Sequence, residues 1–196
     1  MARSTREQAE QNRANVIEAA SRLFRAHSVD KVGIADIMAA VGLTQGGFYK
    51  QFASKDALAG EACALAFRHA LNGWSSTGAP SHAGSPAPLP DLVAYYLSPK
   101  PPEKTCPMIA LAADAAAATP GNPLRAAYTV GVHDLVESFG EEAGETPANR
   151  EAVLLLFAAM VGAAMLTRGI DDDALTGALN DAVVHAAAAF QAPSAG

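Results

Sequence analysis

Residues 34–52 read IADIMAAVGLTQGGFYKQF, and the spacing of their apolar side chains predicts two short helices joined by a turn. In the first half, apolar residues recur at i, i+3, i+4 and i+7, which is the buried face of a helix. These residues are Ile34, Ile37, Met38 and Val41. Gly42 follows and can end that helix, because glycine adopts the left-handed conformation without a Cβ penalty. Two short helices joined through a glycine are typical of the helix-turn-helix motif.

The second helix is expected over residues 45–52, with Thr44 as its N-cap and with Phe48 and Phe52 buried four residues apart. The N-terminal turn of such a helix meets base edges in the major groove, and two adjacent glycines allow close approach of the backbone. The predicted DNA-binding residues are Thr44, Gln45, Gly46, Gly47, Tyr49, Lys50 and Lys55. Any one of these polar residues would equally suit a solvated helix face, so the prediction depends on the pair of helices.

The side chains of this segment suit different parts of a duplex. Gln45 carries the donor and the acceptor that can pair with adenine, and Thr44 offers a hydroxyl or methyl contact. Tyr49 and Lys50 are expected to reach phosphates, which fix orientation without reading sequence.

The segment LTQGGFYKQFASKDAL, preceded by IADIMAAVG, resembles the DNA-binding region of the tetracycline-repressor (TetR/AcrR) family, over about residues 13–62. The resemblance implies a base-reading turn at residues 45–47, a phosphate contact at Tyr49 and a helix start at Lys55. It also implies a homodimeric regulator, most often a repressor, that leaves its operator when a small molecule binds the C-terminal part of the chain.

Two residues depart from the family pattern. Ser28 stands where the family usually has a glycine at the end of the first helix, and Gly33 replaces the usual Ser or Thr cap of the second. Glycine at an N-cap costs only a few tenths of a kcal/mol, so we expect the fold to tolerate the second departure while one possible phosphate contact is lost.

Composition favours a helical protein, and the distribution of charge favours binding of its N-terminal part to DNA. Half of the 196 residues are apolar, only 6 % are aromatic, and alanine is abundant. The net charge is −6, but residues 1–58 carry +2 and residues 59–196 carry −8. A mildly basic head on an acidic body would turn the head toward phosphates, although so small an excess could also arise by chance.

The N-terminus is polar and does not resemble a secretory signal, and the longest uncharged apolar run, Ala152–Leu166, is too short for a confident membrane span. We therefore expect a cytoplasmic protein whose two cysteines stay reduced. We expect neither a cofactor nor a metal site.

The N-terminal part is expected to be a three-helix head followed by a linking helix. A mobile arm, residues 1–5, would either enter a minor groove through Arg3 or simply fray. The helices are expected at residues 6–27, at the two positions described above, and at residues 55–74 with Ser54 as N-cap. The predicted domains are 1–54, which binds DNA, and 55–196, which binds ligand and dimerises.

The rest of the chain reads as a helical bundle. Residues 75–90 contain four prolines and four serines and are expected to form a loop. Further helices are predicted at about 91–97, 107–119, 123–140, 147–169 and 171–191, each preceded by a capping residue, a proline or acidic residues. The predicted fold is all-α with nine helices.

The last two helices are expected to form a homodimer interface. Residues 153–166 are apolar on all sides, and a helix in a small bundle needs only one buried face. Ala158, Ala159, Gly162 and Ala163 would allow a second helix to approach closely, giving a four-helix interface between two chains. The alternative is a monomer in which residues 147–169 form a central helix.

The large side chains of the body are candidates for a ligand pocket. They are Phe67, Trp74, Tyr95, Tyr96, Met108, His133, Phe157 and Met160. Such residues at helical spacing are more often core than ligand contacts. By the family resemblance, a small-molecule effector of unknown identity would bind there, tilt the linking helix and lower operator affinity.

Two other functions stay open. Cys106 lies at a helix start, two residues after Lys104, and could sense oxidants or electrophiles, although buried cysteines are commonly inert. A helical small-molecule carrier without DNA function is the second alternative. An enzyme is not expected, because the five histidines are scattered and no HExxH, CxxC, Gly-x-Ser-x-Gly or phosphate-loop motif is present.

Overall fold

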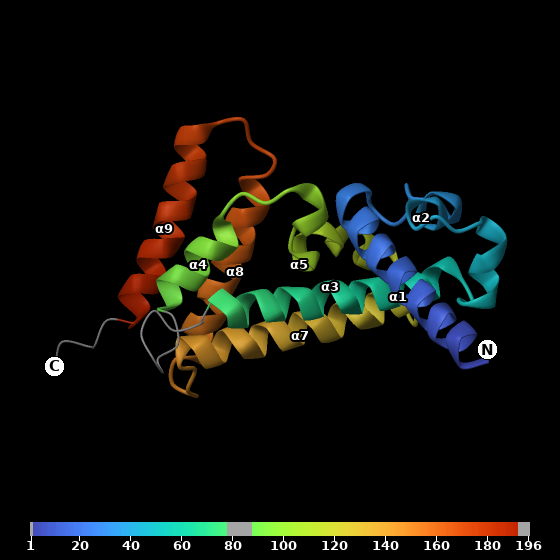
Figure 1. Ribbon diagram of the computed structural model, residues 1–196. Helices are drawn as coiled ribbons and strands as arrows, with labels where there is room; N and C mark the ends of the chain where they lie inside the picture. Colours follow the sequence, from blue (N-terminus) through green and yellow to red (C-terminus); the bar gives the residue numbers. More distant parts are fainter. Residues whose placement is uncertain (1, 78–87, 192–196) are drawn as a thin grey trace. The chain divides into compact units, whose positions relative to one another are not determined.

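A computed structural model describes residues 2–77 and 88–191, and within these ranges the chain is helical without a β-strand. The α-helices are α1 (Ala2–His27), α2 (Ile34–Ala40), α3 (Lys55–Thr77), α4 (Leu89–Leu97), α5 (Pro107–Ala110), α6 (Ala112–Ala117), α7 (Pro123–Ala143), α8 (Arg150–Leu166) and α9 (Asp173–Gln191). The described residues also contain two 3-10 helices, which are η1 (Gln45–Lys50) and η2 (Pro102–Lys104) (Figure 1). The all-α prediction is confirmed.

The structure differs from the nine predicted helices in three places, one of which is the additional 3-10 helix η2. The segment expected as a second helix-turn-helix helix is the 3-10 helix η1, which ends at Lys50 and not at Phe52. The helix expected over residues 107–119 is divided into α5 and α6 at Leu111, whose φ of −109° and ψ of 4° interrupt the α-helical conformation.

The first helix is longer than predicted. It begins at Ala2, so residues 2–5 of the expected mobile arm are helical, and residue 1 lies outside the described residues. The extension is reasonable because good helix formers and i,i+4 pairs follow. Arg6 Nε donates to Glu10 Oε1 at 3.0 Å, and Gln8 Nε2 donates to Asn12 Oδ1 at 2.9 Å.

Three predicted helix starts are stabilised by side-chain caps. The oxygens of Ser54, Asn122 and Asp172 accept backbone N–H groups at 3.0, 2.8 and 2.9 Å, respectively. Such bonds satisfy the free amides at the start of a helix. The N-cap prediction at Ser54 is therefore confirmed.

Several boundaries differ from prediction. α8 begins at Arg150, after a turn in which Asn149 Oδ1 accepts the Thr146 N–H, and it ends at Leu166. α7 continues to Ala143, three residues past the predicted end. α3 continues to Thr77 and α4 starts at Leu89, so the ends of the predicted 75–90 loop are helical. Residues 78–87 lie outside the described residues.

The chain divides into two compact units. The N-terminal unit comprises Met1–Ala70 and Lys100–Val132, and the C-terminal unit comprises Leu71–Pro99 and His133–Gly196. Both boundaries fall inside helices, α3 and α7. This division concerns packing, so the functional domains 1–54 and 55–196 stay a prediction.

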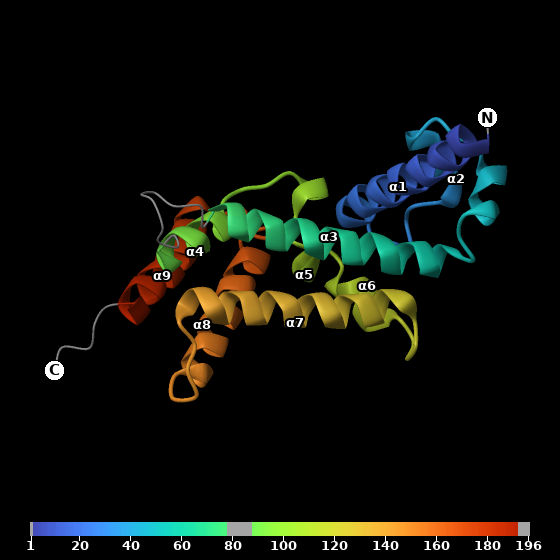
Figure 2. The same cartoon turned by 60° about the horizontal axis from the view of Figure 1, so that its bottom comes forward.

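Within the N-terminal unit, α3 and α7 meet at two glycines, and these parts of the helices lie side by side in Figure 2. A Cβ at Gly60 would lie 2.8 Å from Pro123 Cβ, and a Cβ at Gly131 would lie 2.1 Å from Phe67 Cγ. Real Cβ atoms do not approach so closely, so only glycine fits at both positions. The Phe67 ring therefore packs directly against the backbone of α7.

The C-terminal unit contains the ends of α3 and α7 together with α4, α8 and α9. The last three helices contact one another in every pairing and lie together in Figure 1. Its core contains an aromatic cluster in which Trp74 contacts Tyr96 and Phe139, at centroid distances of 5.9 and 6.3 Å. Phe139 also contacts Phe157 at 5.4 Å. Among the described residues, no helix combines the length and apolar character needed to cross a membrane.

Candidate nucleic-acid interface

The turn between α2 and η1 has the geometry expected from its glycine. Gly42 has a φ of 70°, and its N–H donates to Ala39 O at 3.0 Å. Leu43 N–H donates to Met38 O at 2.9 Å, which closes the end of α2. No atom lies within 4 Å of a Cβ built at Gly42, so glycine is needed here for its backbone conformation and not for space.

The η1 segment is attached to the core by two phenylalanines. Phe48 is fully buried and Phe52 is nearly so, and their rings stack at 5.4 Å. Tyr49 meets the Phe48 ring edge-on at 5.1 Å yet leaves 68 % of its own surface exposed. The buried rings thus hold a short segment whose other side chains face solvent.

The seven predicted DNA-binding residues lie on or beside this segment. Thr44, Gln45, Gly46, Tyr49 and Lys50 are exposed, and Gly47 and Lys55 are partly exposed. A Cβ at Gly46 would meet nothing within 4 Å, so the protein itself leaves open space there. Thr44 is the N-cap residue of η1, but its hydroxyl makes no capping hydrogen bond.

The 3-10 conformation of η1 has a local cause. Glycines at positions 46 and 47 are poor helix formers, and the first turn is closed by a Gly47 N–H to Thr44 O bond of 3.0 Å, which is an i to i+3 bond. Phe52 N–H still bonds Phe48 O at 3.0 Å, after the 3-10 helix has ended.

Arg13 is a positioning residue that the sequence did not reveal. Its Nη2 donates to Glu61 Oε1 at 2.6 Å, and its guanidinium lies 4.8 Å from the centre of the Phe52 ring. Arg13 therefore joins α1 and α3 to Phe52, which follows η1. No local sequence signal identifies it, because Glu61 is 48 residues away.

Residues 16–62 match the family model described as bacterial regulatory proteins, tetR family. This range contains α2, the glycine turn, η1 and the start of α3. These residues therefore belong to the DNA-binding region of the tetR family of bacterial regulatory proteins.

Known proteins are similar to this chain to two different extents. The HTH-type transcriptional regulator TtgR of Pseudomonas putida is 42 % identical over 55 residues, which are 28 % of this chain and 26 % of TtgR. The chain thus matches about a quarter of the length of this curated relative.

The fold similarity covers nearly the whole chain. A TetR transcriptional regulator from Chloroflexus aurantiacus J-10-FL is 26 % identical with a TM-score of 0.71, covering 93 % of this chain and 95 % of its own. A TetR-family regulator from Cytophaga hutchinsonii gives a TM-score of 0.75 at 16 % identity, covering 95 % and 98 %. The tetR fold therefore extends beyond the matched head into the helices that follow.

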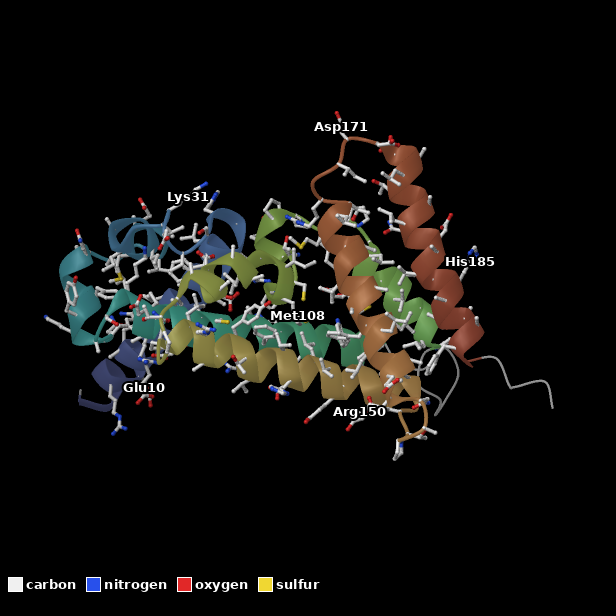
Figure 3. All side chains as sticks on the ribbon, turned by 180° about the vertical axis from the view of Figure 1, so that it is seen from behind. Glu10, Lys31, Met108, Arg150, Asp171 and His185 are labelled. Atoms are coloured by element: carbon white, nitrogen blue, oxygen red, sulfur yellow. The ribbon has the colours of Figure 1, made fainter. Side chains whose placement is uncertain are left out.

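The two departures from the family pattern, at Ser28 and Gly33, are both accommodated. Gly33 is the N-cap residue of α2, and its N–H donates to Asp36 Oδ2 at 2.9 Å. Ser28 adopts a φ of 74°, the region that glycine favours, and its hydroxyl donates to Asp114 Oδ1 at 2.6 Å. Lys31, on the same connection, is exposed and extends away from the ribbon in Figure 3.

The eight residues proposed from the sequence as ligand contacts are not brought into one compact unit. Phe67 and Met108 belong to the N-terminal unit, and the other six belong to the C-terminal unit. Trp74, Tyr96, Phe157 and Met160 are buried, whereas Tyr95, at 39 %, and His133 are exposed. Phe139, at the centre of the aromatic cluster, was not among the proposed contacts.

The two cysteines have different surroundings. Cys63 is buried, and burial raises its pKa to about 12. Cys106 is the N-cap residue of α5 and is partly exposed. Burial lowers the pKa of both Arg25 and Lys100, while a charge on Cys106 would raise them, so both cations lie within electrostatic range of that sulfur.

No group of three or more His, Cys, Asp or Glu side chains that could hold a metal ion occurs in the described part of the chain. An open hollow of about 300 Å³ lies in the C-terminal unit, lined by Val136, Glu137, Gly140, Glu141, Glu145 and Arg150. Arg150 pairs there with Glu145. None of the eight proposed ligand contacts lines this hollow.

Proposed function

We propose that this protein is a tetR-family transcriptional repressor that binds operator DNA through the surface formed by residues 44–50 and Lys55. The observation that carries this proposal is the exposure of Gln45 and Tyr49 beside the buried Phe48 ring. A buried anchor holds the segment, while an amide and a phenol face outward for base and phosphate contacts. Repression, as opposed to activation, rests on the family resemblance.

We further propose that two copies associate through α8 and α9. The outward face of α8 exposes Leu155, Met165 and Leu166 to 72, 63 and 55 %, and no charged residue occurs between residues 152 and 166. α9 adds Leu175, which is 48 % exposed. A contiguous apolar face of this kind favours association. Two-fold symmetry would then present two heads to successive major grooves, about 34–36 Å apart.

The proposed effector is a small molecule that binds the C-terminal unit. The cluster of Trp74, Tyr96, Phe139 and Phe157 supplies large apolar surfaces, and Tyr95 and His133 add accessible polar groups on α4 and α7. Binding would lower operator affinity by favouring a conformation that cannot bind DNA. Phe67 is a weaker contact candidate because its ring already packs against Gly131.

The DNA proposal is tested by selecting duplex fragments from the genome of the source organism and measuring affinity at several salt concentrations. Binding to DNA releases counterions, so affinity should fall as salt rises. Tyr49→Phe and Lys55→Ala should weaken binding to all duplexes, and Lys55→Ala should reduce the salt slope by about one. Gln45→Ala should relax preference at one base pair by roughly 1 to 3 kcal/mol.

The same experiment distinguishes the proposed DNA-binding regulator from a protein that only carries a small molecule. A helical small-molecule carrier would bind no duplex and show no salt slope at any of these concentrations. If Gln45→Ala bound the selected fragments with unchanged base preference, the reading turn would have to lie elsewhere.

We also propose that chemical modification of Cys106 is a second signal that regulates DNA binding. The partly exposed sulfur lies within electrostatic range of Arg25 and Lys100, and nearby cations favour the reactive thiolate. Alkylating Cys106 with iodoacetamide should then lower affinity for the selected fragments, with a Cys106→Ser variant as the unreactive control. Unchanged operator affinity after complete alkylation would show that Cys106 does not regulate DNA binding.

A further inference from the structure

The end of α1 has a backbone conformation that its sequence does not favour. Ser28 has a φ of 74°, and among the described residues it is the one residue other than glycine with a positive φ. A residue with a Cβ adopts this region uncommonly, so surrounding contacts must stabilise it. Ser28 N–H bonds Phe24 O at 2.8 Å, which is the hydrogen bond of a helix that ends in a left-handed residue, a position that glycine usually occupies.

The stabilising contact comes from Asp114, on α6. Its Oδ1 accepts the Ser28 hydroxyl at 2.6 Å and the Val29 N–H at 3.2 Å, and both bonds are partly buried. One carboxylate oxygen thus binds two consecutive residues of the turn that leads from α1 to α2. Bonds to a charged acceptor are stronger than neutral ones, particularly away from water.

A third hydrogen bond attaches the same end of α1 to the same segment. Arg25 Nε donates to Ser21 O at 3.1 Å within α1, while its Nη1 donates to Thr105 O at 3.4 Å. α1 contacts η2 and α5 as well. Arg25 and Ser28 therefore both bond the end of α1 to residues 105–114.

The contact lies where it can control the orientation of the head. Val29 and Val32 are buried, and Gly33 caps α2 one residue later, so the turn leads directly into α2 and η1. Residues 100–132 belong to the N-terminal unit, but the chain before and after them belongs to the C-terminal unit. Asp114 therefore joins the head to a segment whose two ends continue into the C-terminal unit.

We propose that Asp114 is a positioning residue for DNA binding, acting through Ser28 and the Val29 N–H to fix the orientation of α2 and η1. This proposal rests on the proposed operator binding. An operator with two half-sites requires both heads in a defined pose, whereas non-specific binding to phosphates does not. Loss of the contact should therefore weaken specific binding more than non-specific binding.

The test compares variants by two affinities, one for the selected genomic fragment and one for a random duplex of equal length at low salt. Asp114→Ala removes both acceptor bonds, and Asp114→Asn keeps an oxygen that can accept them. Ser28→Gly removes the hydroxyl donor but suits a φ of 74°. Asp30→Ala is the matched control, because Asp30 is exposed and lies two residues from Ser28, and the charge change is the same.

We expect Asp114→Ala to lower affinity for the selected fragment about tenfold while random-duplex affinity changes less than about twofold. Asp114→Asn should retain most of the specificity, and Asp30→Ala should leave the ratio of the two affinities unchanged. Hydrogen exchange of the Val29 amide should become about tenfold faster in Asp114→Ala, which reports the lost bond without DNA. If Asp114→Ala does not fold, Ser28→Gly should show a smaller loss of specificity, about threefold.

The proposal is overturned if the folded Asp114→Ala variant, or Ser28→Gly in its place, keeps the wild-type affinity ratio. It is also overturned if Asp30→Ala lowers the ratio equally, since the effect would then be one of charge. A wild-type protein with no preference for any genomic fragment would overturn the proposed function itself. In that case a faster Val29 exchange would identify the contact as one that only stabilises the fold.

Discussion

The η1 surface and the aromatic cluster of the C-terminal unit place their large side chains in opposite ways. On η1, Tyr49 and Gln45 face solvent while Phe48 anchors the segment. In the C-terminal cluster, Trp74 and Phe157 are buried against other rings. The first arrangement is ready to contact another molecule, whereas the second must change before a ligand can enter. A large side chain therefore indicates a binding site only when its packing leaves surface free.

The largest effect is expected where glycine allows aromatic packing. Gly131→Ala would place a Cβ 2.1 Å from the Phe67 ring, so we expect the free energy of unfolding to fall. Overpacking of this kind costs about 3 kcal/mol. Urea unfolding at constant protein concentration measures the change. Gly177→Ala is the control, because nothing lies within 4 Å of its Cβ, and equal losses in the two variants would show that Phe67 is not fixed there.

The two cysteines should differ in reactivity, because Cys63 is buried and Cys106 is partly exposed. Because burial raises the pKa of Cys63 to about 12, its thiolate is scarce near neutral pH and increases about tenfold per pH unit until that pKa. We expect iodoacetamide to modify Cys106 at least about 100-fold faster than Cys63 in the folded protein. Mass spectrometry of timed samples measures both rates. Equal rates in the native protein would contradict the burial of Cys63.

The apolar face of α8 should matter for association and not for folding. Leu155→Glu places two charges in the proposed symmetric interface, and we expect dimerisation to weaken by about 2 kcal/mol, roughly 30-fold. Sedimentation equilibrium measures the dissociation constant. Val130→Glu is the matched control, since Val130 is 60 % exposed on α7. A monomeric wild-type protein, or the same result for both variants, would remove the proposed interface.

Two hydroxyls in the head should differ in their contribution to stability. Ser54 Oγ accepts the Ala57 N–H, so Ser54→Ala should lower the free energy of unfolding by about 1 kcal/mol. Thr44 makes no capping bond, so Thr44→Ala should change stability by less than about 0.5 kcal/mol while weakening DNA binding. Thermal unfolding compares the two. If Thr44→Ala lowered the free energy of unfolding as much as Ser54→Ala, the Thr44 hydroxyl would stabilise the fold and would not serve DNA binding alone.

The smallest effect is expected at Gly33. A serine there could cap α2 but would place its Cβ 3.0 Å from the flexible Asp36 carboxylate. We expect the two contributions to leave stability within about 0.5 kcal/mol of wild type. Gly33→Ala, which brings the same Cβ without the hydroxyl, should be less stable than Gly33→Ser. The reverse order in urea unfolding would show that the serine hydroxyl does not cap the helix.

The sequence predicted the head well because its determinants are local. The apolar spacing of α2, the turn at Gly42 and the burial of Phe48 and Phe52 all lie within residues 34–52. The change from α-helix to 3-10 helix in η1 was missed, although the two glycines were a signal for it. The division of α5 from α6 at Leu111 had no comparable signal.

The sequence by itself determined an all-helical chain, a glycine turn and an exposed polar segment, because periodicity and turn chemistry act between neighbouring residues. Only the tertiary structure decided that Phe67 packs on Gly131, that Arg13 pairs with Glu61 and that Asp114 holds Ser28. Each of these contacts joins residues far apart in the chain. No local pattern encodes such pairs, since they form only when helices from distant parts of the chain pack together.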